Sequence, residues 1–124
     1  MRMSVANWRK IAQIEDGCGG TIYKVADAGN SGLRSFEIAM CVFPAGETAT
    51  RHVHHRMEEA YFVIEGEGEV ELDGKWYPVK TEDCIAIPIG TIHRMRNTST
   101  DHELRFVCVN APNWLESDSP TVPD

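Results

Sequence analysis

Basic residues are scarce in this sequence. Over 124 residues, 12 lysines and arginines stand against 19 aspartates and glutamates, which gives a net charge of −7. Nucleic acids and anionic membrane surfaces recruit proteins through clustered positive charge. We therefore expect neither a nucleic acid nor a membrane among the partners of this protein.

Long apolar runs are also missing. No stretch approaches the ~20 consecutive apolar residues that a helix needs to span a bilayer. The first residues, MRMSVANWRKIAQ, contain no apolar segment like the core of a signal peptide. The expectation is a soluble, cytoplasmic protein.

Paired cysteines are absent too, because none of the four cysteines belongs to a C-x-x-C motif. At this chain length and cysteine density, a disulfide scaffold is not expected. Cys18 lies in the glycine-rich stretch DGCGGT, and we interpret it as a turn thiol rather than a nucleophile, since no base is identifiable beside it. Cys41, Cys84 and Cys108 lie in strand-like apolar stretches, where a free cysteine behaves as a small buried hydrophobe.

Glycine, proline and Asn/Asp residues recur every ~8–12 residues, a pattern typical of many short strands. Asp73-Gly74, between EVEL and KWYPV, predicts a two-residue hairpin. An all-β chain must close its sheet or stack two sheets to hide its edges. The predicted strands are residues 21–25, 34–43, 49–54, 60–65, 68–72, 75–79, 84–87, 93–97 and 104–110.

The chain length suits one domain, and 42% apolar residues can fill its core. Residues 1–20 form an N-terminal segment with one short helix expected near 5–14. Residues 21–112 form the β domain. Residues 113–124 are polar and proline-rich, so we expect a disordered, flexible tail.

The strand predicted at residues 60–65 is apolar on both faces. Ala60, Phe62 and Ile64 lie on the face opposite to Tyr61, because successive side chains of a strand alternate. A strand that is apolar on both faces is covered on both faces. Either a second sheet or another subunit covers the outer one, and we expect a homodimer.

Histidines and a glutamate gather in the stretch RHVHHRMEEAYF. His52 and His54 are two residues apart, which places their Cα atoms ~6.5 Å apart on one face of a strand. A turn then brings Glu59 back beside them, so that one hairpin offers three metal ligands. His93, which follows the turn PIGT, is a fourth candidate if the sheet closes.

Two spaced motifs carry a resemblance to a known family. The first is Gly46-x5-His52-x-His54-x4-Glu59-x6-Gly66, and the second is Pro88-x-Gly90-x2-His93-x3-Asn97, with 21 residues between them. Both resemble the two motifs of the cupin family, over about residues 35–110. One position departs from the family pattern, since Glu82 occupies the place of the glycine that begins the second motif.

The resemblance implies a conical β-barrel (a double-stranded β-helix, or jelly roll), often dimeric, that holds one divalent metal ion through three histidines and one glutamate. Carried over position by position, the ligands are His52, His54, Glu59 and His93. Glu58 competes with its neighbour as the carboxylate ligand. Glu59 is favoured because six residues separate it from Gly66, as in the first motif, and because strand parity turns it inward.

Imidazole and carboxylate ligands suit Fe, Mn, Ni, Co, Cu or Zn, and the composition of the site does not choose among them. Inward parity predicts that Thr50, Val63, Met95 and Phe106 line the substrate pocket. Tyr61 is the expected catalytic residue, because a buried phenol near a metal can donate a proton. The parity places no cation in the pocket, which favours a small, largely neutral molecule as substrate.

Two classes of function follow. The leading one is a metal-dependent enzyme that acts on a small molecule, with an Fe(II)-type dioxygenase first and an isomerase, lyase or decarboxylase as the alternatives. The other is a module that binds a small ligand through its metal without turnover. The fold supports many chemistries, so the choice among them rests on analogy.

Overall fold

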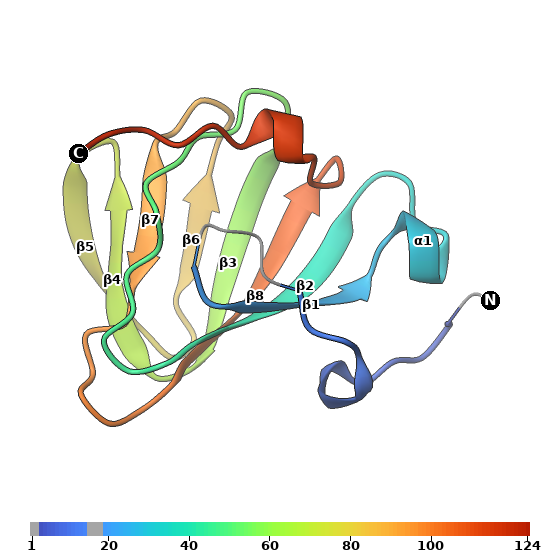
Figure 1. Ribbon diagram of the computed structural model, residues 1–124, viewed down its shortest axis with the longest axis horizontal. Helices are drawn as coiled ribbons and strands as arrows, with labels where there is room; N and C mark the ends of the chain where they lie inside the picture. Colours follow the sequence, from blue (N-terminus) through green and yellow to red (C-terminus); the bar gives the residue numbers. More distant parts are fainter. Residues whose placement is uncertain (1–2, 15–18) are drawn as a thin grey trace.

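A computed structural model describes residues 3–14 and 19–124 of the chain (Figure 1). Cys18 and its predicted turn lie outside these residues. The helical elements in them are the 3₁₀ turn η1 (Trp8–Lys10), the helix α1 (Ala28–Ser31) and the 3₁₀ turn η2 (Glu116–Asp118). The strands are β1 (Thr21–Ala26), β2 (Glu37–Phe43), β3 (Glu58–Glu65), β4 (Glu67–Leu72), β5 (Lys75–Lys80), β6 (Cys84–Ile87), β7 (His93–Arg96) and β8 (Leu104–Ala111).

The strands form two antiparallel sheets around one core. The larger sheet has the order β1-β2-β8-β3-β6, and the smaller has the order β5-β4-β7 (Figure 1). Inward side chains of both sheets meet between them, among them Val63, Val70 and Leu104, none more than 1% exposed. The predicted all-β barrel architecture is confirmed.

The predicted hairpin at Asp73-Gly74 joins β4 to β5. Leu72 pairs with Lys75, so the loop contains two residues. Asp73 and Gly74 both have positive φ, 50° and 88°, which is the backbone that a type I′ turn requires. The Asp-Gly signal in the sequence therefore specified both the turn and the register of the hairpin.

Gly66 follows β3, where the chain passes from the larger sheet to the smaller one. Its φ is 95°, and a Cβ atom there would lie 2.6 Å from the carbonyl oxygen of Glu103. Glu82, which replaces a glycine of the cupin pattern, also has a positive φ, 77°. Glu82 therefore adopts the positive-φ backbone of this turn, although a glycine would adopt it more easily.

The segment of residues 49–54, predicted as a strand, is not a regular one. It touches β7 through an isolated bridge between His52 and His93, and Thr48 bridges to Arg96 just before it. On its other side, His52 also bridges to Thr121. The segment thus lies between β7 and the C-terminal residues. It lacks the continuous ladder of backbone hydrogen bonds that the predicted strand would have.

The prediction of a disordered tail is wrong for the C-terminal segment. Residues 113–124, called here the C-terminal strap, cross the end of the sheets where β3 begins (Figure 1, red). The amide of Val53 donates to the carbonyl of Pro120 at 3.2 Å, and the amide of Val122 donates to Arg51 at 2.8 Å. Backbone pairing with the histidine segment orders residues whose own composition would not.

The remaining differences concern the N-terminal segment and the cysteines. The helix expected near residues 5–14 is a single 3₁₀ turn. The ring of Trp8 in this turn packs against Tyr23 of β1, with the two ring centroids 5.0 Å apart. Cys84 is exposed, unlike Cys41 and Cys108. No helix in residues 3–14 and 19–124 is long and apolar enough to cross a membrane.

Candidate metal centre

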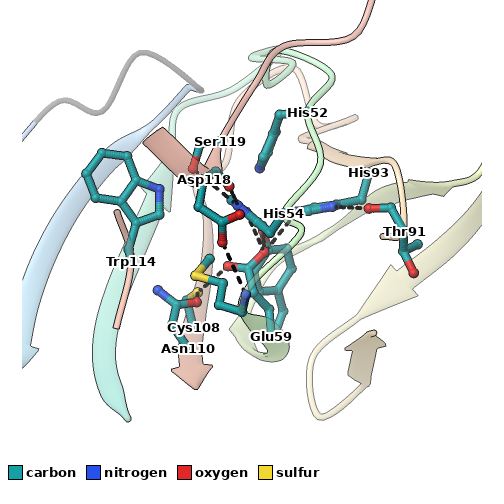
Figure 2. A network of polar contacts seen from close by, with 12 residues as sticks. His52, His54, Glu59, Thr91, His93, Cys108, Asn110, Trp114, Asp118 and Ser119 are labelled. Carbon is teal, nitrogen blue, oxygen red and sulfur yellow. Dashed lines mark hydrogen bonds and ion pairs between the residues drawn. The ribbon is translucent and has the colours of Figure 1, made fainter. Parts of the chain in front are cut away.

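The four predicted ligand residues lie together at one end of the cavity between the sheets (Figure 2). His52 and His54 come from the segment before β3, Glu59 is the second residue of β3, and His93 is the first residue of β7. All four are buried, and one potential ligand atom from each lies within 4.8 Å of the others. Glu58 and His55 are exposed, so the structure selects Glu59 as the carboxylate of the cluster.

Each imidazole is held by a backbone carbonyl. The Nδ1 atoms of His52 and His54 lie 2.7 Å from the oxygens of Thr50 and Asp118. The Nδ1 atom of His93 lies 2.9 Å from the oxygen of Thr91. Because a carbonyl only accepts, Nδ1 carries the proton in every ring. In the neutral rings, all three Nε2 atoms therefore offer a lone pair, as metal-bound histidines do.

Two of the Nε2 atoms lie close to one oxygen of Glu59. Oε1 lies 3.2 Å from Nε2 of His54 and 2.9 Å from Nε2 of His93. Despite this proximity, Nε2 of His93 makes no hydrogen bond of acceptable geometry and is fully buried. A buried polar atom without a partner is costly. Three lone pairs and a carboxylate around one point fit a divalent cation.

The pKa shifts favour ligation by two of these groups. Burial, together with the charge of His93, lowers the pKa of His52 to about 4, so this ring is neutral at physiological pH. Burial opposes ionisation of Glu59, but the imidazoles of His54 and His93 outweigh it and hold its pKa well below the usual range. Burial likewise opposes protonation of His54, but Glu59 outweighs it and raises the pKa. A cation would displace that proton.

The second oxygen of Glu59 is occupied by a thiol. The Sγ atom of Cys108 lies 3.2 Å from Oε2 of Glu59 and 3.1 Å from Oδ1 of Asn110. Hydrogen bonding with Cys41, burial and the charge of Glu59 all raise the pKa of Cys108, so the group is a neutral donor. The thiol orients the carboxylate, which leaves Oε1 for the cluster.

Asp118 of the C-terminal strap fixes the histidine segment from outside. Its carboxylate accepts from the amides of His55 at 2.8 Å, Arg56 at 3.0 Å and Met57 at 3.1 Å. Burial opposes ionisation of Asp118, but these amides outweigh it and lower its pKa. Its backbone oxygen is also the partner of His54. One residue thus holds both the turn between His54 and β3 and the tautomer of His54.

A cavity that opens to solvent lies beside the cluster. Three of the predicted residues line it: Tyr61, Met95 and Phe106. Val63 is fully buried in the core instead. Thr50 is exposed and lies outside the lining, whereas Ala49 is part of it. The prediction for Thr50 is wrong because parity holds only along a regular strand.

Polar residues that the sequence analysis did not select also line the cavity. They are Lys24 of β1, Asn110 of β8 and Trp114 of the C-terminal strap. The prediction of a pocket without a cation is therefore wrong, since Lys24 faces it. The inward parity of Ile22 could have identified Lys24, two residues later on the same strand. No local signal pointed to Trp114 or Asp118, which come from the segment predicted to be disordered.

Comparison with known proteins places the chain in a family. It is 29% identical to the polyketide synthase CurC of Streptomyces cyaneus over 113 residues, 86% of this chain and 73% of that protein. It is 36% identical over 62 residues to a 5-nitrosalicylic acid 1,2-dioxygenase of Bradyrhizobium sp, which covers 50% of this chain but only 30% of that protein. The fold matches Streptomyces PAC13 bound to uridine with a TM-score of 0.80 and 17% identity, over 98% and 92% of the two chains. Residues 39–110, more than half of the sequence, match the model of the cupin domain, and the chain belongs to the cupin family.

Proposed function

We propose that this protein is a metal-dependent enzyme that acts on a small organic molecule. The observation that carries the proposal is the convergence of three imidazole Nε2 atoms and one carboxylate oxygen at the wall of a cavity. His52, His54, Glu59 and His93 would hold the ion, and their donor set suits Fe, Mn, Ni, Co, Cu or Zn. The ion would supply Lewis-acid activation of a substrate oxygen or, if it is iron, oxygen chemistry.

The residues of the chain supply proton transfer and exclusion of water. The hydroxyl of Tyr61 lies 3.4 Å from Oε1 of Glu59, which places a phenol beside the atoms that would bind the ion. From there it can donate a proton to a substrate oxygen or receive one. Met95, Phe106 and Phe43 form an apolar wall that keeps bulk water from the reacting atoms.

The reaction that these groups support best is a proton-transfer reaction: an elimination, an isomerisation or a ring closure. Such a reaction needs a Lewis acid and a proton carrier but no oxidant, and the cavity offers Tyr61 for the second role. Dioxygenation is the second candidate. The similarity to a 5-nitrosalicylic acid 1,2-dioxygenase favours it, as do the two positions that four protein ligands leave open on an octahedral ion.

Turnover with and without oxygen separates the two reactions. The protein, loaded with each metal in turn, is incubated with small enols, diketones and hydroxylated aromatic acids in air and under argon. We expect products in both atmospheres, with the mass of the substrate or that mass less one water. Oxygen uptake matched to products that gain two oxygen atoms would instead establish the dioxygenase. Binding without turnover under every condition would leave a ligand-binding module.

We also propose that the protein is a homodimer joined through the outer face of the larger sheet. Phe62 and Ile64 of β3 are 46% and 39% exposed there, with the half-buried Val107 and Val109 on the neighbouring strand. Adjacent exposed apolar side chains on a flat sheet face mark an interaction surface.

A charge on this face should separate the subunits. We expect sedimentation analysis to find a dimer for the native chain and a monomer for Phe62→Asp, because the dimer would have to bury an unpaired carboxylate. Tyr77→Asp is the control, since Tyr77 is similarly exposed, at 40%, on the other sheet. A native monomer, or dissociation by both substitutions, would contradict this interface.

A further inference from the structure

A second polar group faces the cavity across the larger sheet from the metal centre. Asn110 on β8 pairs with Glu59 on one side and with Glu37 of β2 on the other. Lys24 of β1 lies one strand further, opposite Ala39 of β2. Trp114 of the C-terminal strap completes the group, and Figure 2 shows it across the cavity from His93. The metal centre and this group thus line one cavity.

The ammonium group of Lys24 is paired but not saturated. It forms an ion pair with Oε2 of Glu37, a carboxylate that is 1% exposed. The backbone amide of Trp114 donates to the other oxygen of Glu37. Both oxygens of Glu37 are therefore engaged within the protein, whereas an ammonium carries three donors. The side chain of Lys24 remains 19% exposed, at the wall of the cavity.

Asn110 and Trp114 add two further donors. Asn110 is 4% exposed, and its Oδ1 atom faces the thiol of Cys108 at 3.1 Å. In Figure 2 its amide nitrogen points to the side where Trp114 lies, and the indole nitrogen of Trp114 faces the cluster. Within residues 3–14 and 19–124, neither nitrogen donates a hydrogen bond to another side chain or to the backbone. Donors that face a cavity favour a ligand that brings an acceptor.

The donors extend away from the metal centre along the larger sheet: Asn110 pairs directly with Glu59, and Lys24 lies two strands further. Three strand spacings of ~4.8 Å separate the strands of Lys24 and Glu59, and both residues line the cavity. Phe43, Phe106 and Met95 add an apolar wall to the same cavity. The gap suits a molecule about one ring wide, apolar in its middle and polar at both ends.

We propose that Lys24, Asn110 and Trp114 bind a carboxylate of the substrate at the end opposite to the oxygens that meet the metal ion. The proposal rests on the function proposed above and narrows its substrate class to small organic acids with an apolar, ring-sized body. An ammonium and two neutral donors in a largely buried wall match a carboxylate, because charge-assisted hydrogen bonds are the stronger kind.

Three probes with the same metal-binding end test the assignment: catechol, 3,4-dihydroxybenzoate and 3,4-dihydroxybenzamide. Their adjacent hydroxyls bind a metal ion, and the last two differ only in the charge at the far end. Calorimetry with the cobalt-loaded full chain gives each Kd. We expect the benzoate to bind about tenfold more tightly than the benzamide, a difference of ~1.4 kcal/mol.

Substitutions test whether Lys24 causes the preference for the benzoate over the benzamide. Lys24→Met should reduce the benzoate-to-benzamide ratio to about one while the bound cobalt stays unchanged. Because this substitution removes the cation that pairs with the buried Glu37, the double variant Lys24→Met with Glu37→Gln is measured as well. It should reduce the benzoate-to-benzamide ratio in the same way. Lys80→Met is the control, since the side chain of Lys80 is 77% exposed on β5, and it should keep the native ratio.

The outcomes separate this inference from the proposed function. If catechol binds through the metal but the native ratio is near one, or if both Lys24 variants keep the native ratio, the carboxylate site is wrong and the metal-dependent function stands. If no probe binds the cobalt-loaded protein more tightly than the metal-free protein, the proposed function fails and this inference fails with it.

Discussion

Replacing Glu59 by alanine will empty the metal centre, whereas replacing Glu58 by alanine will not. Oε1 of Glu59 is the atom on which the imidazoles of His54 and His93 converge, at 3.2 and 2.9 Å. Without it, the ion loses its one anionic ligand and is held by three neutral nitrogens in a buried site, where an unneutralised charge is costly. Elemental analysis of the untagged protein should fall from about one ion per chain to a small fraction of that.

Glu58 is a close control for this experiment. It is the adjacent residue of β3, has the same side chain and is exposed on the opposite face of the strand. Glu59→Gln keeps the shape of the side chain, so metal loss in that variant would point to charge rather than to packing. Equal metal contents in Glu59→Ala and the native chain would refute ligation by Glu59, and an empty centre in Glu58→Ala would refute the choice between the two residues.

The ligand set could be predicted because its geometry is local. His52 and His54 are separated by one residue and Glu59 by four more, so one turn brings all three side chains together whatever the rest of the chain does. His93 was accessible for another reason, since the turn before it and the closure of the sheet fix where β7 begins. The alternation of side chains thus predicts which residues of one hairpin lie together. Closure of the sheet adds one further strand, β7, to that prediction.

The residues that the sequence did not reveal depend on irregular or distant structure. Alternation failed at Thr50 because residues 49–54 make isolated bridges rather than a ladder, and Ala49 lines the cavity instead. The glycine expected at Glu82 is missing although φ there is positive, so tertiary contacts rather than local preference impose that turn.

The C-terminal strap was the largest error, and its cause is physical. Its polar, proline-rich composition cannot form a core of its own, which is why disorder was predicted. Its contacts are instead hydrogen bonds to backbone groups of the histidine segment, 61 to 64 residues away for Asp118. Such a contact leaves no periodic signal in either partner. The ordering depends on a carboxylate that meets backbone amides already gathered by the turn before β3.

Replacing Asp118 by alanine should therefore weaken metal binding although Asp118 touches no metal. The substitution removes the acceptor of the amides of His55, Arg56 and Met57, so the turn that spaces His54 from Glu59 loses its anchor. It also loosens the strap whose backbone oxygen holds the Nδ1 proton of His54 at 2.7 Å. Loss of such supporting contacts typically costs 10- to 100-fold in metal affinity, and we expect an increase of about that size in the Kd for zinc, measured by competition with a chromophoric chelator.

Glu116→Ala is the control, because Glu116 is an exposed carboxylate of η2 two residues from Asp118 and has no part in this network. Asp118→Asn separates the two contributions: the backbone oxygen that holds His54 remains, and an amide oxygen can still accept, but the charge that stabilises three converging amides is gone. We expect its zinc affinity to lie between those of the native chain and Asp118→Ala. If all three variants bind zinc as the native chain does, the four ligands are preorganised by the sheets alone, and the strap contributes to the wall of the cavity through Trp114 but not to the metal centre.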